Sequence, residues 1–403
     1  MKIKIILQIQ SLAVGKGGAE RVATDLADHM YLRGHDVYMA YRDIGPPAYK
    51  ANQNIKYLPY KDLKSLTKIV RNINPNAFFS FYVNHLIIQN YSVVYNTNIP
   101  FGMQECTNPI RAVEKNWRTG HGINKIQSTW EREIVASGAH RIRLVMPSYS
   151  DSFPEYIRKQ VRGFSNPAFP QKLIANHKSN SHVRKIINIG GMKDNKNLLD
   201  LINAFILLKD DFPNWKIDIF GKDASKLNHY IENILKVINE NALQDRIIVR
   251  GPSDDIFKEF SNSDIHVISS LEEGCPTCVL EAMASGVPSI GFDECAGTNE
   301  LIVNGVNGLL VSSENRVLSL ADSLRKLMGS NDLRTQYGSN ALLASKIFDP
   351  ENTYNQWERL FIEMAQYKAN PNKLMDEQMS VDPERALHAQ RMRLEMMKVY
   401  NNL

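Results

Sequence analysis

The sequence is poor in cysteine and contains no long hydrophobic run. Four cysteines in 403 residues are too few for the disulfide framework of a small secreted protein. Every apolar run is interrupted well before the roughly 18 residues that a membrane-spanning helix requires. The first residues, Met-Lys-Ile-Lys-Ile-Ile-Leu, lack the small-residue cleavage site of a signal peptide. We therefore expect a first β-strand there and a cytoplasmic protein.

Two of the cysteines, Cys275 and Cys278, have the spacing of a redox or zinc pair. A structural zinc would need a second close pair of ligands, which Cys106 and Cys295 do not form, and a redox pair of this kind is expected early in a small domain. The sequence favours small buried side chains at these positions and predicts no metal site.

The positive charge lies in the first part of the chain. The net charge is +5, but residues 1–165 hold 22 Lys and Arg against 12 Asp and Glu, and residues 166–403 hold 26 against 31. A basic first half suits an anionic acceptor or peripheral contact with the anionic inner membrane, and it is equally compatible with an ordinary solvated face. The basic residues form no dense run and no recognisable binding module, so we expect no nucleic-acid partner.

The length suits two domains of roughly 150–200 residues each. Strand-like segments alternate with helical or loop material, which is typical of an α/β fold with a doubly wound parallel sheet; in the first half they are 2–10, 37–41, 77–82, 100–104 and 142–146. A proline-punctuated break at 165–170 separates this half from a second core that begins near Ile186.

Each half begins with a strand, a glycine-rich turn and a helix. The first turn contains Gly17 and Gly18, and the second runs from Gly190 to Lys196. Such a turn lets a ligand approach backbone amides at the start of a helix. The first turn lacks the glycine spacing of the dinucleotide fingerprint, and a tight turn without a ligand remains the alternative.

Residues 265–292 read as a strand, a helix from about Pro276 and a second strand. Pro276 fits the first helical turn, and Gly286 fits a left-handed helix end. Glu273 then lies in the loop after a strand, where parallel sheets bind ligands, and Glu281 lies one turn into the helix. Alternatively, Glu273 is a solvated loop acid and Glu281 only complements the helix dipole.

The whole string from Ser269 to Pro288, with seven residues between Glu273 and Glu281, resembles the signature of family 4 of the retaining nucleotide-sugar glycosyltransferases. Residues 17–22, 33–37 and 296–311 are similar to other parts of that family, and the resemblance covers about residues 1–365. It implies the GT-B architecture, in which two Rossmann-like domains face each other across a cleft. We expect an acceptor-binding domain (1–168), a nucleotide-sugar-binding domain (169–347), a helix that crosses back (348–365) and a helical extension (366–403).

The resemblance also implies the site. Glu273 and Lys196 are its catalytic residues: Lys196 stabilises the donor diphosphate, and Glu273 holds hydroxyls of the donor sugar. Glu281 would accept hydrogen bonds from the ribose. The implied donor-binding residues are Gly17, Gly18, Gly190, Lys196, Glu273, Gly274, Cys275, Pro276, Thr277 and Glu281. Glu105 and Arg21 are weaker candidates for the acceptor, and Glu105 is as compatible with a capping or turn acid. No cofactor is implied beyond the nucleoside-diphosphate sugar itself, with a UDP-sugar favoured.

One position departs from the family. Relatives carry an arginine that grips the donor diphosphate where this chain has Gly191. Lys193 or Arg21 would have to replace it, and a lysine does not reproduce a bidentate guanidinium. The sequence is therefore compatible with lowered donor affinity, a lowered rate or inactivity.

The resulting hypothesis is a retaining glycosyltransferase that moves a sugar to a glycan or polyprenyl-diphosphate-linked acceptor in bacterial capsule, lipopolysaccharide or other surface-polysaccharide synthesis. One alternative is a catalytically weak partner subunit that binds nucleotide-sugar or glycan and scaffolds an assembly complex. A second is a sugar-nucleotide epimerase of similar architecture. A helix at 383–400 would pack either on the body of the protein or on a second copy in a homo-oligomer.

Overall fold

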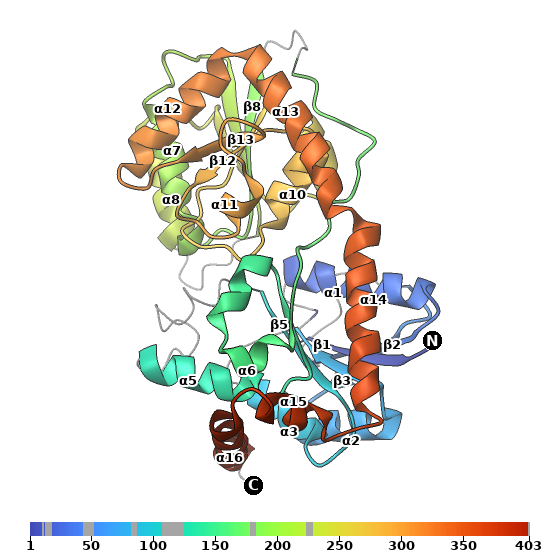
Figure 1. Cartoon of the computed structure of the whole chain (residues 1–403). Helices are drawn as coiled ribbons and strands as arrows, with labels where there is room; N and C mark the ends of the chain where they lie inside the picture. Colours follow the sequence, from blue (N-terminus) through green and yellow to red (C-terminus); the bar gives the residue numbers. More distant parts are fainter. Residues whose placement is uncertain are drawn as a thin grey trace. The chain divides into compact units, whose positions relative to one another are not determined.

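A computed structural model describes residues 1–9, 12, 18–42, 52–81, 87–106, 125–177, 183–222 and 229–401. The chain divides into two compact units. Unit 1 consists of residues 1–165 and 351–403, and unit 2 consists of residues 166–350. Each unit is an α/β layer structure with its own sheet (Figure 1). No helix in the described part of the chain is both long and apolar enough to cross a membrane.

The sheet of unit 1 has seven parallel strands in the order β3-β2-β1-β4-β5-β6-β7. The chain winds outwards from β1 in one direction and then from β4 in the other, so the order reverses between β1 and β4. Both of these strands are buried, apart from Lys4 at the start of β1. The strands are β1 (Lys4–Ile9), β2 (Asp36–Arg42), β3 (Lys56–Tyr60), β4 (Ala77–Ser80), β5 (Phe101–Glu105), β6 (Arg141–Leu144) and β7 (Val161–Gly163).

Helices between these strands cover the sheet (Figure 1). Helix α2 shows how the local sequence sets their limits: Asp62 caps its first turn in a reciprocal pair of bonds with Ser65, and Asn74 ends it in the left-handed conformation. The helices of this part are α1 (Gly18–Leu32), α2 (Leu63–Ile73), α3 (Ile87–Val94), α5 (Lys125–Ala136) and α6 (Glu155–Arg158).

Unit 1 is completed by the carboxy-terminal end of the chain. Helix α14 (Pro350–Tyr367) buries Trp357 among the rings of Phe79, Phe81 and Phe164 at centroid distances of 5.2, 5.8 and 5.3 Å. Its acidic side chains pair with strand residues, as when Glu363 accepts hydrogen bonds from Arg141 at 2.6 Å and Arg162 at 2.7 Å. Helix α14 is therefore part of the hydrophobic core of unit 1.

Two further helices, α15 (Lys373–Met379) and α16 (Pro383–Asn401), follow α14. Helix α16 packs against α3 and α5 of the same unit and buries Ala386, Ala389 and Met397. Arg385 of α16 also binds Glu133 of α5 through two nitrogens at 2.6 and 2.7 Å. The helix thus packs on the body of its own chain, and contact with a second copy stays a prediction.

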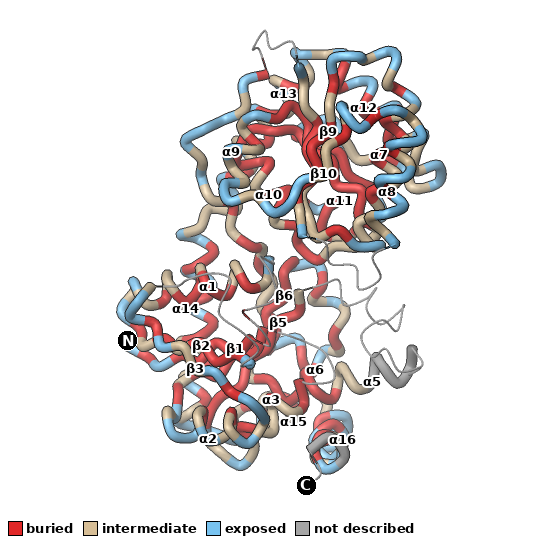
Figure 2. Tube along the Cα trace, turned by 180° about the vertical axis from the view of Figure 1, so that it is seen from behind, coloured by how far each residue is buried: buried red, intermediate tan, exposed pale blue. Residues whose placement is uncertain are grey.

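The sheet of unit 2 has six parallel strands in the order β10-β9-β8-β11-β12-β13. Aliphatic and aromatic side chains from its strands and from flanking helices form one core, and Figure 2 shows buried residues along β9. The strands are β8 (Arg184–Ile189), β9 (Trp215–Phe220), β10 (Ile247–Arg250), β11 (Ile265–Val267), β12 (Ser289–Phe292) and β13 (Gly308–Val311).

The helices of unit 2 follow these strands in the alternation expected of a doubly wound sheet. They are α7 (Leu198–Ile206), α8 (His229–Glu240), α9 (Ile256–Ser261), α10 (Thr277–Ala284), α11 (Thr298–Leu301), α12 (Arg316–Gly329) and α13 (Asn331–Ser345). The predicted fold class, two Rossmann-like α/β domains with parallel sheets, is confirmed. The sequence did not predict β3, β7 or α15.

Candidate functional site

The predicted donor residues of unit 2 gather around β8 and β11, the two neighbouring strands between which the strand order reverses. In open parallel sheets, ligands bind beyond the carboxyl ends of the strands at such a point. Gly190 and the short 3-10 helix Asp194–Lys196 follow β8, and the loop with Glu273 follows β11. The topology therefore brings both segments to the same edge of the sheet.

The turn after β8 is tightly packed against the end of β9. A Cβ atom on Gly221 would lie 1.7 Å from the carbonyl oxygen of Gly190, so no other residue fits at position 221. A Cβ atom on Gly190 would lie 3.3 Å from Cε of Lys196. The small residue at 190 thus leaves the space that the Lys196 side chain occupies.

The loop after β11 is hydrogen-bonded to that turn. The Ser269 hydroxyl donates to the carbonyl of Lys196 at 2.8 Å, and the Leu271 amide donates to the carbonyl of Asn195 at 2.8 Å. Because these bonds join the two segments directly, Lys196 and the Glu273 loop keep a fixed geometry relative to each other.

Lys196 and Glu273 form an ion pair, with Nζ and Oε1 2.5 Å apart. The Ser270 hydroxyl donates to the same carboxylate oxygen at 2.6 Å. Burial by itself would lower the pKa of Lys196, but the charge and hydrogen bond of Glu273 outweigh that effect and hold the pKa above its usual value. Lys196 therefore stays a cation at neutral pH.

A second lysine, Lys193, is electrostatically coupled to this pair. Burial and the positive charge of Lys196 lower its pKa, and the charge of Glu273 partly offsets them. The positive charge of Lys196 thus disfavours the charged form of Lys193. An added anion would relieve this repulsion.

The thiols beside the pair are buried and protonated. Burial raises the pKa of Cys278 and raises that of Cys295 to about 11. Cys275 is buried as well. This supports the interpretation of the Cys275–Cys278 spacing as packing. Among the described residues, no group of three or more His, Cys, Asp or Glu is arranged to hold a metal ion.

Helix α10 starts directly after the glutamate loop. Pro276 occupies its N-cap position without a side-chain cap, and Thr277 is its first residue. The free amides of a helix amino terminus, together with the helix dipole, favour an anion at this end. Glu281 lies in the second turn and is half-buried. Gly286 ends the helix with a φ of 69°, as the sequence predicts.

The predicted residues of unit 1 are arranged less clearly. Gly17 lies outside the described residues, and Gly18 is the first residue of α1. Arg21 on α1 lies 3.7 Å from the carboxylate of Asp25. Glu105 is fully buried and bound by two nitrogens of Arg132 at 2.9 and 3.0 Å. An acceptor contact of Glu105 would therefore require this ion pair to open.

Sequence reasoning missed Arg316, which also lies at this edge of unit 2. Its guanidinium donates to the carbonyl of Ser269 at 2.8 Å, pairs with Asp200 at 2.6 Å and lies 3.5 Å from the ring centroid of Phe292. Through its bond to the Ser269 carbonyl, Arg316 helps to hold the loop that contains Glu273 in place. All of its partners are distant in sequence, so no local pattern could have identified it.

The arrangement offers a half-buried cation, a helix amino terminus and two acidic side chains at one sheet edge, which suits a phosphate-bearing ligand with hydroxyl groups. Comparison with known families agrees, because the family described as "Glycosyl transferases group 1" matches residues 170–343. Unit 2 is similar to the group 1 glycosyl transferases over nearly its whole length. The matched range lies within unit 2 and contains every donor-site residue discussed above except Gly17 and Gly18.

The relatives that match this chain differ in length. An exopolysaccharide phosphotransferase of Streptomyces coelicolor is 33% identical over 43% of this chain, which spans only 18% of that relative. An N-acetylgalactosaminyltransferase of Campylobacter jejuni, whose named substrate is a diphospho-undecaprenol-linked sugar, is 21% identical over 84% of this chain and 94% of its own length.

Solved structures share the fold. HepE of Anabaena, solved in complex with UDP and glucose, superposes with a TM-score of 0.70 at 15% identity. The match covers 89% of this chain and 98% of HepE. The shared fold therefore includes both units.

Proposed function

We propose that this protein is a glycosyltransferase that moves a sugar from a nucleoside-diphosphate donor, with a UDP-sugar favoured, to a glycan or polyprenyl-diphosphate-linked acceptor, and that the anomeric configuration is retained. The observation that carries the proposal is the Lys196–Glu273 pair beside the amino terminus of α10. It combines a cation for the diphosphate with a carboxylate for sugar hydroxyls. No cofactor takes part.

The main task is to stabilise the leaving diphosphate. Breaking the bond between the sugar and the phosphate builds negative charge on the nucleoside diphosphate, and groups already aimed at that charge lower the barrier. Lys196 and the free amides of α10 near Thr277 would serve this role, together with the amides of Gly17 and Gly18. Because Lys196 is held in place by Glu273, little reorganisation is needed when the charge develops.

The acidic residues would orient the donor. Glu273 accepts hydrogen bonds from hydroxyls of the sugar near the reacting carbon, and Glu281 accepts from the ribose hydroxyls. The unit 2 residues Gly190, Gly274, Cys275 and Pro276 line the approach. No protein nucleophile is proposed: the acceptor hydroxyl attacks on the face that the diphosphate leaves, and the leaving phosphate takes its proton.

The names of the relatives support the proposed acceptor class. The Campylobacter relative is named for an undecaprenol-linked acceptor, and the Streptomyces relative for exopolysaccharide. We extend this to assembly of a bacterial surface polysaccharide. Helix α2 supports contact with the anionic inner membrane, because Lys64, Lys68 and Arg71 lie exposed along one side of it. Sedimentation with anionic and neutral vesicles tests that contact.

Nucleotide binding tests the core of the proposal. Calorimetry with UDP, GDP and ADP should give micromolar affinity for one nucleotide and clear loss in Glu281→Ala, since that variant removes the ribose contact. NMR of the product formed from the matching donor should show the same anomeric configuration as the donor. Wild-type protein that binds none of the three nucleotides would contradict the proposal.

Gly191 favours a second candidate, a scaffold subunit that binds nucleotide-sugar or glycan without efficient turnover. The resemblance to family 4 implies a phosphate-binding arginine at this position. Lys193 is the nearest replacement on the same turn, and its coupling to Lys196 supports that role. Gly191→Arg separates the two candidates: a large gain in turnover from a near-zero base favours the scaffold. Substantial turnover by the wild-type protein would rule out the scaffold candidate. Conversion of the donor without any acceptor would instead indicate an epimerase.

A further inference from the structure

Residues 166–177, which we call the strap, form the first segment of unit 2 and bind near both ends of helix α10. At one end, the buried Asn166 side chain donates to the carbonyl of Cys275, in the loop just before α10, at 3.4 Å. At the other end, the Ala175 amide donates to the carbonyl of Ser285, the residue that follows α10, at 2.9 Å. The donor helix therefore has a strap contact beyond each terminus.

The second bond at the far end comes from His177, which is 5% exposed. Its Nε2 atom lies 2.9 Å from the carbonyl oxygen of Gly286, and because a carbonyl only accepts, Nε2 must be the donor. The contact is closely packed. A Cβ atom on Gly338 of α13 would lie 2.2 Å from the Gly286 oxygen and 2.9 Å from Nε2 of His177.

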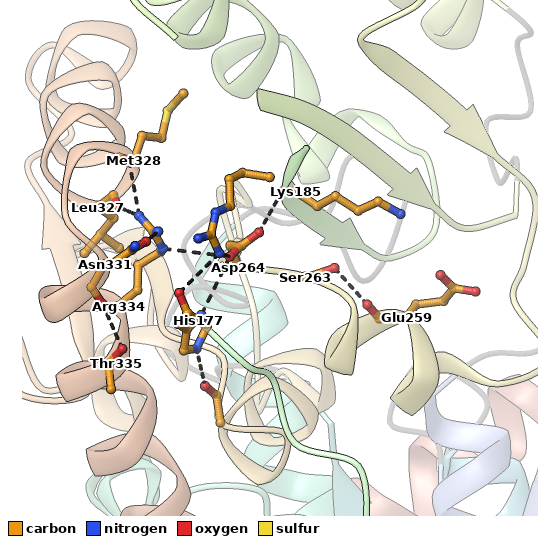
Figure 3. Close-up of polar contacts among 12 residues, drawn as sticks. His177, Lys185, Glu259, Ser263, Asp264, Leu327, Met328, Asn331, Arg334 and Thr335 are labelled. Atoms are coloured by element: carbon orange, nitrogen blue, oxygen red, sulfur yellow. Dashed lines mark hydrogen bonds and ion pairs between the residues drawn. The ribbon is translucent and has the colours of Figure 1, made fainter. Parts of the chain in front are cut away.

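His177 is itself fixed to the sheet (Figure 3). Arg184, the first residue of β8, donates to the carbonyl of His177 at 3.2 Å and to the Asp264 carboxylate at 2.7 Å. Asp264 lies 3.9 Å from the ring Nδ1 of His177 and accepts a bond from the Lys185 amide at 2.9 Å. Buried Arg334 of α13 approaches the same carboxylate at 3.9 Å. The strap end is thus anchored to the starts of β8 and β11.

The beginning of the strap is anchored separately. The Ala168 amide donates to the carbonyl of Phe348 at 2.8 Å. Residue 166 is where the chain enters unit 2, and residue 350 is where it leaves that unit. The two connections are therefore hydrogen-bonded together two residues from the Asn166 side chain.

We propose that Asn166 and His177 are positioning residues that set where the amino terminus of α10 and its preceding loop stand for the donor diphosphate. This rests on the proposed function of the site. Neither residue touches the donor: Asn166 acts through Cys275, and His177 acts through Gly286. Helix α10 has eight residues and no side-chain N-cap, so its own sequence supplies little to fix its first turn.

The experiment compares Asn166→Ala and His177→Leu with wild type in the full chain. His177→Gln is the rescue variant, because its amide nitrogen can still donate to Gly286. Gln171→Ala is the matched control, because that side chain bonds only within the strap, to the Phe169 carbonyl at 2.6 Å. Two readouts are taken: hydrogen exchange of a peptide covering residues 274–287, and calorimetric affinity for UDP, GDP and ADP.

Each loss variant should speed exchange of that peptide about three- to tenfold, as expected for one lost hydrogen bond, and weaken the affinity for the nucleotide by a similar factor. His177→Gln and Gln171→Ala should stay near wild type. Unchanged exchange in both loss variants overturns the inference. Faster exchange with unchanged affinity also overturns it, because the strap would then stabilise α10 without positioning the donor.

Failure of the proposed function gives a different pattern. If wild type binds none of the three nucleotides, the donor role of Asn166 and His177 falls with the proposed function. Exchange still shows whether the strap holds α10, because that readout needs no ligand.

Discussion

The two units have the same strand winding but differ in how the chain completes them. In each, the chain starts at an inner strand, winds outwards to one edge and then returns to fill the other side, as the orders β3-β2-β1-β4 and β10-β9-β8-β11 show. In each, the sequence has glycines shortly after the first strand. The difference lies in how the units are closed. Unit 2 is one continuous segment, while unit 1 needs residues 351–403 to complete its core.

The family match is confined to residues 170–343, within the continuous unit. The candidate site of unit 2 requires particular residue types: a cation, two acidic residues, and glycines at positions where two backbone segments approach each other closely. Unit 1 is held together by aromatic packing and by ion pairs between α14 and its strands. Many sequences can supply such packing, so a unit of this kind leaves a weaker signature than one that binds a defined ligand.

Removing the Trp357 ring should have the largest effect and should affect unit 1. Trp357→Ala deletes a fully buried side chain that contacts Phe79, Phe81 and Phe164, and we expect a loss of about 3–5 kcal/mol in the free energy of unfolding. Calorimetry should show the transition of unit 1 moving and that of unit 2 remaining. Trp357→Phe, the control, should lose less. Equal shifts of both transitions would show that the units do not unfold separately.

Removing the Lys196 cation should affect the chemistry of unit 2, and it should also lower the stability of that unit because Glu273 loses its partner. For Lys196→Ala we expect kcat/KM for the donor to fall roughly 10²–10³-fold, because the charge on the leaving diphosphate loses its main counter-ion. Lys236→Ala, an exposed lysine on α8 of the same unit, serves as the control and should leave kcat/KM unchanged. A fall of less than threefold in Lys196→Ala would assign the diphosphate to other groups, with Lys193 first.

Acid should loosen the attachment of α14. Burial would raise the pKa of Glu363, but the hydrogen bonds and charges of Arg141 and Arg162 outweigh it and hold the pKa below its model-compound value of 4.5. A lowered folded pKa means that the stabilisation is complete above pH 4.5 and is lost as pH falls through the folded value. Glu363→Gln should cost about 1–2 kcal/mol at pH 7 and flatten this dependence.

Urea unfolding of unit 1 between pH 3 and 7 measures the effect. Glu395→Gln is the matched control, since Glu395 is an exposed acid on α16 that pairs only with Lys398. The prediction is wrong if Glu363→Gln and wild type lose stability equally on acidification.

The smallest effect should come from the outer surface of α16. Arg385 is half-exposed and pairs with Glu133, and exposed ion pairs contribute little. Arg385→Ala should cost below about 1 kcal/mol in urea unfolding. Arg391→Ala, on the same helix and exposed, should be neutral by comparison. A loss above 2 kcal/mol would mean that this pair, and not the buried face of α16, anchors the helix.

Much of the architecture follows from sequence periodicity, and the limits of that reasoning are specific. Strands such as Trp215–Phe220 and the helix end at Gly286 are visible because apolar spacing and punctuation act locally. The edge strands β3 and β7 were not predicted from the sequence, because β3 is only partly buried and β7 has only three residues. Helix α15 is only seven residues long.

The candidate site likewise contains some residues that the sequence indicated and others that it did not. The resemblance drew attention to Lys196 and Glu273, and the fold places them in contact. It did not indicate Ser270, Arg316 or His177. Their contacts join segments far apart in the chain, except for Ser270, whose bond to Glu273 spans three residues but has no distinctive spacing. Long-range partners of this kind follow from the topology and not from any local pattern.

The discontinuity of unit 1 sets an order of events during translation. Unit 2 is fully synthesised at residue 350, so its sheet and the proposed donor site can form before the ribosome has added residues 351–403. The core of unit 1 must wait, although its strands emerged first, because Trp357 and the rest of α14 are made after the strands against which they pack. Until then, Phe79, Phe81 and Phe164 lack the ring that covers them in the finished protein. The first half of the nascent chain is thus the stretch that calls for chaperone protection.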